Sequence, residues 1–395
     1  AFFTYGRFLE RRLGIDNSRP TPSHTDYDGV DRVPANPAVL FGHHFSSIAG
    51  AGPIVGPVIA AVAFGWAVPL VWVLVGAVFI GGVHDFAALA ASIRNRARSI
   101  ADVARESMSP LAYRLLLVFM WLALVYVLTV FTDLTATTFV EDGGVATSSW
   151  LFVALAVCFG LSVYRFKVPV VWSTLLFVPL VFLATWVGQL IPISADWIAQ
   201  TLGMSPGRAW SLALIAYCFG ASVTPVWILL QPRDYLSSFL LYASMLLALV
   251  GILFGGFEVQ FPAFITWDAA GLGPLFPIVF ITVACGACSG FHSLVASGTT
   301  SKQIDKESHA RTVGYGAMLV EGLVAVMALA TVMMLARDDP LAGKPPLTVY
   351  GTGIGRFAAV IGIPEKLGFS FGLLALSTFI LTTLDTATRL GRYIF

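Results

Sequence analysis

The strongest constraint on the fold of this chain is a long stretch without ionisable side chains. Residues 45–83 contain no Asp, Glu, Lys or Arg. A helix crosses the apolar core of a bilayer with about 20 residues, so the stretch is too long for one crossing. The turn-forming sequence GWAVP at 65–69 divides it into two predicted helices, 42–66 and 68–91. Only 11% of the residues are charged, against about 25% in ordinary soluble proteins, which indicates a membrane protein.

The same rule, applied along the whole chain, predicts ten membrane-spanning helices. Apart from the two above, they are 112–138, 149–164, 168–190, 208–231, 235–257, 274–300, 312–336 and 367–389. The predicted fold is an all-α polytopic membrane helix bundle. The first residues read as the end of a helix and the last ones stop within a helical pattern, so both ends are expected to have been trimmed. No signal peptide is visible.

The positive charges support this count. With the loop after the second helix placed in the cytoplasm, strict alternation puts eighteen of the 23 Lys and Arg residues on the cytoplasmic side. This count assigns Arg233 and Arg389 to cytoplasmic loops. The net charge is only +1 and no long basic run exists, so nucleic-acid binding is not expected.

Ten helices make helices 1 and 6 enter the membrane from opposite sides, as in an inverted five-plus-five repeat. Both carry helix-breaking residues, at Ser46–Pro57 and at Gly220–Pro225. Discontinuous helices in matched positions are typical of secondary transporters, although each break alone is also compatible with a packing kink. The predicted organisation is an N-terminal helix end and cytoplasmic segment (1–41), a first five-helix repeat (42–191) and a second repeat (192–395).

Three segments carry a resemblance to a known family. GHHFSSIAGAGPIVGP (42–57), GACSGFHSLVASGTTSKQ (286–303) and LTTLDTATRLGRY (381–393) resemble the signature segments of the carbon starvation protein A family. The resemblance implies a bacterial or archaeal plasma (inner) membrane protein that imports peptides or pyruvate during nutrient limitation. It also implies the five-plus-five fold of the amino-acid/polyamine/cation superfamily. Members of the family are usually longer at both ends.

An unwound segment inside a membrane exposes backbone groups, which become ligands where they line a cavity. Free amides at the start of a half-helix suit a carboxylate, and nearby hydroxyl groups add contacts. The alternative for each hydroxyl is a bond to its own helix. The candidate substrate-binding residues are Ser46, Ser47, Ala49, Gly50, Gly52, Ser222 and Thr224.

Candidates for ion coupling come from ionisable and hydroxyl groups within the spans. Glu321 lies about 15 Å into its helix, where a carboxyl group is costly and is either a proton carrier or a hydrogen-bonded structural acid. His43 and His44 precede the first break, and the family resemblance suggests Thr299 and Thr300 as a sodium site, with helix capping as the alternative. The full set is His43, His44, Ser297, Thr299, Thr300 and Glu321, for a proton or sodium ion.

A third set of residues suggests a metal-binding site. Cys285, Cys288 and His292 are spaced i, i+3 and i+7, which places them on one face of a continuous helix. Two thiols and an imidazole resemble part of a zinc site, but a zinc site usually has four ligands, and cysteines often only pack between membrane helices. Among the other buried charges, we expect Asp385 to pair with Arg389, and His84 and Asp85 to form an ion pair or a proton relay.

These observations favour an ion-coupled secondary transporter of a small carboxylate-bearing nutrient, in contact with membrane lipid. One alternative is a transition-metal carrier using Cys285, Cys288 and His292. A starvation sensor and an intramembrane enzyme are two further alternatives. The chain contains no GxxxxGK[ST], GxSxG or HExxH motif, so ATP-driven transport and hydrolysis are disfavoured and no enzyme activity is expected. The sequence leaves the substrate and any protein partner open.

Overall fold

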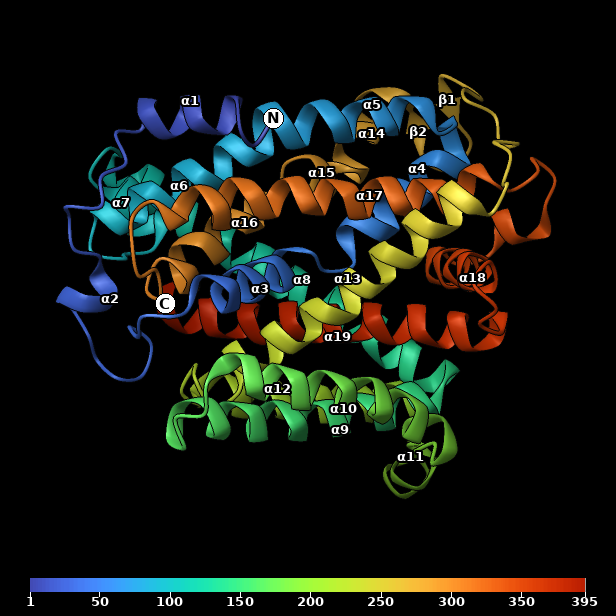
Figure 1. Ribbon diagram of the computed structural model, residues 1–395. Helices are drawn as coiled ribbons and strands as arrows, with labels where there is room; N and C mark the ends of the chain where they lie inside the picture. The colour runs from blue at the N-terminus through green and yellow to red at the C-terminus, as the bar shows by residue number, and fades with distance from the viewer. Residues whose placement is uncertain (395) are drawn as a thin grey trace.

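The computed structural model describes residues 1–394, and these residues form an almost entirely helical protein (Figure 1). The only strands among them are two residues long, β1 (Asp268–Ala269) and β2 (Gly273–Pro274), and they pair antiparallel. Seven continuous helices within this part of the chain are long and apolar enough to cross a membrane, or eight if one bent pair is counted as a single span. The chain is therefore an all-α polytopic membrane protein, as the sequence predicts.

Most of the predicted spans correspond to observed helices. The seven continuous spans are α5–η1–α6 (Ala67–Gly76, Ala77–Gly81, Gly82–Arg94), α8 (Pro110–Glu141), α9–η2 (Gly143–Gly160, Leu161–Arg165), α10 (Val170–Leu190), α13 (Leu230–Phe254), η4–α17 (Arg311–Gly316, Ala317–Met333) and α19 (Glu365–Ile394). The shorter helices at the ends of the bundle are α1 (Tyr5–Arg12), α2 (Pro22–Thr25), α7 (Ile100–Arg105), α11 (Asp196–Leu202), η5 (Pro340–Gly343) and α18 (Pro346–Ala359).

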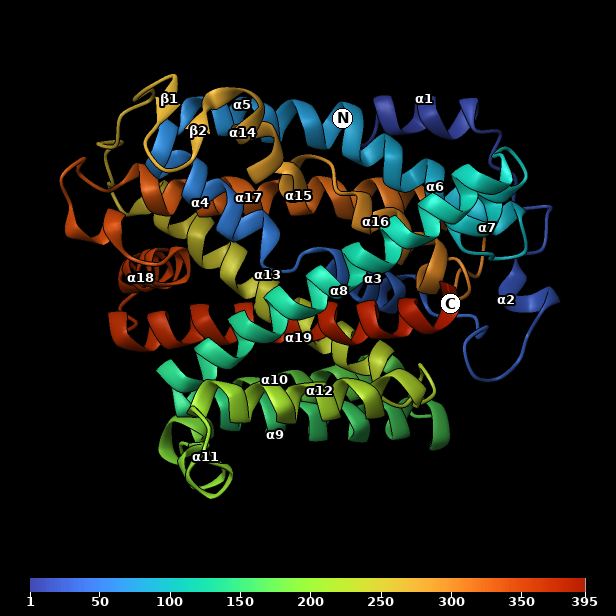
Figure 2. The same ribbon diagram turned by 180° about the vertical axis from the view of Figure 1, so that it is seen from behind.

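Most of the long helices lie side by side along one axis of the molecule. In Figure 1, α2, α7 and the C-terminus lie at one end, and β1, β2 and α11 lie at the other. The view from behind shows α8 running obliquely across α19, against which it packs (Figure 2). Burial separates central from peripheral helices: 83% of the most apolar window of α19 is buried, but only 17% of that of α8. The outward face of α8 carries large apolar side chains, as a lipid-facing helix requires.

The first predicted interruption is present. α3 (Pro37–Ile48) starts with the Asn36 side chain accepting a hydrogen bond from the amide of Ala38, and it ends at Ala49, whose backbone leaves the helical region. α4 (Gly52–Phe64) continues after a bend of 41°. Pro53 has no amide hydrogen to donate, which makes a helix start at this position favourable. Helix 1 is therefore discontinuous, with its break at Ala49–Ala51.

The second interruption was predicted in the wrong helix. α12 (Pro206–Val223) is regular up to its end, and α13 begins only at Leu230. Thr224 is extended because Pro225 follows it, so the sequence 220–225 ends a helix and does not break one. Segment 274–300, predicted as one continuous span, is the discontinuous one. It consists of α14 (Leu275–Thr282), α15 (Ala284–Ala287), α16 (Gly290–Val295) and η3 (Ala296–Thr300).

The two interrupted segments lie against each other. α4 packs on α14 and α15, and α3 packs on α16 and η3. Glycine makes this close approach possible: a Cβ atom on Gly56 would lie 2.1 Å from the carbonyl oxygen of Thr282, and one on Gly52 would lie 2.5 Å from Cβ of Cys285. In Figure 1, both interruptions lie near the middle of the molecule's long axis. The division of the chain into two repeats at residue 191 stays a prediction.

Two arginines assigned to cytoplasmic loops are buried inside the bundle. α13 begins five residues before the predicted start of its helix, so Arg233 lies within the helix and is 1% exposed. Arg389 lies in α19 and is fully buried. Counting Arg233 and Arg389 as residues of cytoplasmic loops was wrong. A guanidinium group can be buried when carboxylates or carbonyl groups pair with it.

Candidate functional site

The first half of the interrupted helix carries a buried hydrogen-bond network. Nδ1 of His43 lies 2.6 Å from Oδ2 of Asp234, at the start of α13, and both side chains are fully buried. The hydroxyl group of Ser47 donates to the same carboxylate oxygen over 3.3 Å, and that of Ser46 donates to the backbone carbonyl of Asp234 over 2.8 Å. α3 and α13 are thus joined by polar contacts immediately before the break.

A second ion pair extends this network. Arg233 donates to the carboxylate of Asp385 on α19, which also accepts a hydrogen bond from the hydroxyl group of Tyr217, and the guanidinium group lies 3.4 Å from Oδ1 of Asp234. The predicted pairing of Asp385 with Arg389 is wrong. Arg389 instead donates to the backbone carbonyl groups of Ala221 and Thr224, and it pairs with Asp31. Residues spaced i and i+4 on a helix meet only when no better partner faces either of them.

Nε2 of His43 has two polar neighbours, one that can accept a hydrogen bond and one that can only donate. Oγ1 of Thr299 lies 3.4 Å away and itself donates to the carbonyl group of Val295, so it can accept a hydrogen bond from His43. The side-chain amide nitrogen of Gln303 lies 3.5 Å away and can only donate. The site therefore offers a partner to the protonated ring and another to the neutral ring.

The backbone of the break is the other candidate for ligand binding. Ala49, Gly50 and Gly52 lie where α3 ends and α4 begins, and the amide of Gly50 is bonded to the carbonyl group of Ile48. A Cβ atom on Gly50 would lie 2.8 Å from Oγ1 of Thr383 on α19. Pro53 has no amide hydrogen, and the amides of Ile54 and Val55 bond to the carbonyl group of Ala51. Of the first residues of α4, Gly52 therefore offers its amide to the break, together with the positive end of the helix.

The structure separates the remaining substrate candidates from this break. Ser222 and Thr224 are at the end of α12, which packs against α8 and α19. Their hydroxyl groups donate to the carbonyl groups of Phe219 and Gly220 in their own helix. This is the alternative considered for any hydroxyl group in a membrane helix.

The hydroxyl cluster of η3 faces the two histidines. Oγ1 of Thr300 lies 2.9 Å from Nδ1 of His44, and Thr299 contacts His43 as described. The hydroxyl group of Ser297 donates to the carbonyl group of Ser293 and accepts from the amide of Ile100. The contacts of Thr299 and Thr300 bring the predicted ion-coupling residues of η3 next to those of α3.

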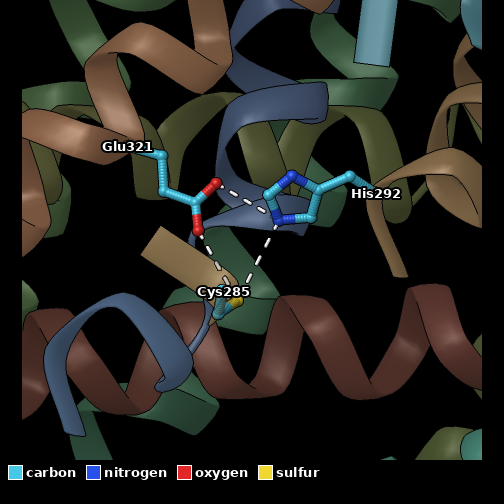
Figure 3. Close-up of side chains that lie close together, drawn as sticks. All are labelled: Cys285, His292 and Glu321. Atoms are coloured by element: carbon cyan, nitrogen blue, oxygen red, sulfur yellow. Dashed lines mark hydrogen bonds and ion pairs between the residues drawn. The ribbon is translucent and has the colours of Figure 1, made fainter. Parts of the chain in front are cut away.

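Glu321 lies in a separate cluster, together with two of the three predicted metal ligands. Oε1 of Glu321 is 3.6 Å from Sγ of Cys285, and Oε2 is 3.2 Å from Nε2 of His292. Figure 3 shows the three side chains pointing toward one another from different segments of the chain. Cys288 is not among the ligand atoms that converge, because the chain is extended there and the helical spacing on which the prediction rested is interrupted.

Asp85 completes this second cluster. Its Oδ2 lies 2.9 Å from Nδ1 of His292, and its Oδ1 lies 2.9 Å from Nδ1 of His84. His84 and Asp85 therefore form the predicted contact, and Asp85 has a second partner, His292, that the sequence did not indicate. The sequence analysis also missed Asp234 and Gln303. The signal for Asp234 was a pair of adjacent opposite charges after Pro232, in a segment too apolar for a loop.

A cavity of about 570 Å³ lies beyond the break, at the end of the bundle that carries β1 and β2. Its lining includes Val58 and Val62 of α4, Asp268 of the strand pair and Lys344 before α18. Asp268 and Lys344 thus bring one charge of each sign to the lining of the cavity.

Comparisons with known proteins agree with the fold. The family model described as "Carbon starvation protein CstA" matches residues 1–345. A relative named "Peptide transporter CstA" from Campylobacter jejuni is 37% identical over 93% of this chain, and one of the same name from Bacillus subtilis is 32% identical over the whole chain. A relative named "Pyruvate/proton symporter BtsT" from Escherichia coli is 36% identical over 87% of this chain.

The chain is shorter than these relatives. It spans 52% of the length of the Campylobacter protein, 72% of the Bacillus protein and 49% of the Escherichia protein. No solved structure matches it. A family match over most of the chain, together with relatives above 30% identity, shows the relationship, and the chain belongs to the carbon starvation protein CstA family.

Proposed function

We propose that this chain forms the core of a secondary active transporter that imports a small carboxylate-bearing nutrient, a short peptide or pyruvate, across a bacterial or archaeal plasma membrane. It carries out no chemical reaction on its cargo. The observation that carries the proposal is the contact between two interrupted helical segments, α3–α4 and α15–α16, near the middle of the bundle. The names of the relatives, peptide transporter and pyruvate/proton symporter, support the substrate class.

The substrate carboxylate binds at the break between α3 and α4. The amide of Gly52 and the positive end of the α4 dipole attract an anion without requiring a buried cationic side chain. Thr383 on α19 lies beside Gly50, and its hydroxyl group, which here donates to the carbonyl group of Ser47, is a second donor for the carboxylate. Unwound backbone is stable at this depth because protein surrounds it on all sides.

The coupling ion is a proton carried by His43. Arg233 on α13 brings one positive charge to two carboxylates, those of Asp234 and Asp385, so a proton on His43 makes the buried set neutral. The other side chains that face His43, Thr299, Gln303 and Ser47 with its partner Thr386, are uncharged. Thr299 and Thr300 contact imidazole nitrogens, which favours the proton over sodium in this arrangement.

Purified protein in liposomes tests the function. Uptake of radiolabelled pyruvate, dipeptides and amino acids is measured by counterflow, and then with an imposed pH gradient or sodium gradient. We expect one carboxylate class to accumulate with the pH gradient alone. A Gly50→Ala variant, whose new methyl group lies against Thr383, should lose uptake while Gly391→Ala, in an open position on α19, retains it. Wild-type uptake by Gly50→Ala, or accumulation driven by sodium alone, would overturn the substrate site or the coupling ion, respectively.

A further inference from the structure

The cluster of Cys285, His292 and Glu321 is not needed for the proposed substrate site or for the proton site. It lies where the segment α15–α16 meets α6 and α17. Glu321 and His292 are fully buried, and Cys285 is packed against Gly52 of α4. A thiol, an imidazole and a carboxylate brought together at such a depth require an explanation of their own.

Asp85 determines the state of the His292 ring. A carboxylate can only accept a hydrogen bond, so Nδ1 of His292 carries the proton in the 2.9 Å contact with Oδ2 of Asp85. In the neutral ring, Nε2 then presents a lone pair toward Cys285 and Glu321. A carboxylate on the far nitrogen of a histidine is the usual second partner of a histidine that binds a metal ion.

Three electron-pair donors converge on one point in front of Nε2. Oε2 of Glu321 is buried and makes no hydrogen bond, although it lies 3.2 Å from Nε2, so the imidazole does not satisfy it. Sγ of Cys285 lies 4.0 Å from Nε2 and 3.6 Å from Oε1 of Glu321. A buried carboxylate oxygen without a donor is costly, and a cation at this point would satisfy all three groups.

The separations fit a tetrahedral zinc ion. Zinc lies about 2.3 Å from sulfur and about 2.0–2.1 Å from nitrogen and oxygen, so tetrahedral ligand atoms are about 3.3–3.6 Å apart. Nε2 lies 3.2 Å from Oε2 of Glu321 and 4.0 Å from Sγ, and Sγ lies 3.6 Å from the other carboxylate oxygen, Oε1. A small rotation of the carboxylate, and a shift of Sγ toward Nε2 by a few tenths of an ångström, would bring one oxygen, the sulfur and the nitrogen to the tetrahedral separations. Sulfur and nitrogen ligands together select zinc or a related transition metal over sodium, magnesium or calcium.

We propose that Cys285, His292 and Glu321 bind a resident zinc-class transition-metal ion, with Asp85 as the positioning residue of His292. The ion is not the cargo. Cys285 precedes the extended residues Cys288 and Ser289, and His292 follows them. Glu321 is a ligand from the neighbouring span, α17. The ion thus links both parts of the interrupted segment α15–α16 to α17 and holds them in place beside the break between α3 and α4. Glu321 is thereby a metal ligand and not the coupling group.

Metal content tests the proposal independently of transport. The protein is purified without chelators, incubated with zinc, passed over a desalting column and analysed by mass spectrometry for metals. We expect about one zinc ion per chain, and a loss of most of it in Cys285→Ser and in Glu321→Gln. Cys288→Ser is the matched control and should retain the ion. Asp85→Asn should weaken zinc binding by about 10–100-fold without abolishing it.

Cobalt provides a second readout. Cobalt(II) bound through a thiolate gives a sulfur-to-metal charge-transfer band in the near ultraviolet, which should be present in the wild type and in Cys288→Ser and absent in Cys285→Ser. Chelator treatment should lower the melting temperature of the wild type but not that of Glu321→Gln. Zinc-incubated wild type with no bound metal would overturn the proposal. Equal losses from Cys285→Ser and Cys288→Ser would do so too. Failure of transport by metal-loaded protein would instead concern the proposed function alone.

Discussion

His43 and Asp234, 191 positions apart in the sequence, form a fully buried contact of 2.6 Å between Nδ1 and Oδ2. The contact joins the half-helix before the first break to the start of α13. Because α3 and α13 pack along each other, the proposed protonation of His43 would act on the helix pair that borders the proposed substrate site.

Asp234→Asn should uncouple transport from the proton. The amide can still accept a hydrogen bond, but it lacks the charge that stabilises protonated His43, and a charge-assisted hydrogen bond is worth about 1.5–3 kcal/mol. We expect accumulation driven by a pH gradient to fall at least about tenfold, since 1.4 kcal/mol is a factor of ten. Counterflow exchange should continue, because it requires no net proton movement. Ser244→Ala, a buried hydroxyl group on the same helix, is the control and should leave both unchanged.

Arg233→Met should destabilise the protein by about 3–5 kcal/mol, because it leaves two buried carboxylates without their cation. Adding Asp385→Asn to this variant removes one of the unpaired charges and should recover part of the loss. Thermal melting in detergent measures both effects. The exposed Arg208→Met should change stability by less than about 0.5 kcal/mol. A double variant no more stable than Arg233→Met would show that the two side chains are not coupled.

Gly56→Ala should be strongly destabilising, since the new methyl group would occupy the position of the Thr282 carbonyl oxygen. Overpacking of this kind costs about 1–3 kcal/mol or more, and the backbone atom cannot rotate away. Gly220→Ala is the opposite case: nothing lies within 4 Å of its Cβ position in regular helix, so a gain of up to about 1 kcal/mol is expected. Comparable yields and melting temperatures for the two variants would contradict the close approach of α4 and α14.

Lys302, between η3 and η4, should make stability depend on pH. Burial lowers the pKa of its ammonium group to about 7, despite the nearby carboxylate of Asp31, from 10.5 in the unfolded chain. The folded protein therefore binds fewer protons than the unfolded chain between pH 7 and pH 10.5, and stability rises with pH in this window. Lys302→Met should raise the melting temperature most at pH 7 and progressively less toward pH 10. The exposed Lys306→Met should show no such trend, and a constant difference for Lys302→Met would contradict the burial argument.

The fold class and most of the membrane spans were predictable from the sequence, because the bilayer places the same requirement on every segment. Backbone groups in lipid must be paired within a helix, so apolar length identifies most spans, and proline with glycine marks where winding fails. The break at Ala49–Ala51 follows from local sequence in this way. The break at Cys288–Ser289 does not, because GACSG contains no proline to mark it.

Local sequence was sufficient to identify a membrane helix bundle, to place the break in its first helix, and to locate the histidines, the hydroxyl cluster and Glu321 within the spans. It placed Arg233 and Asp234 outside the spans, although both lie in α13. The interaction partners of these buried side chains became known only from the packing of the helices. Asp385 pairs with Arg233 and not with its neighbour Arg389, and Cys285 meets Glu321 and not Cys288. The physical reason is that a buried charge or thiol must be satisfied by whatever group faces it, and facing groups come from helices packed together over separations that local spacing does not encode.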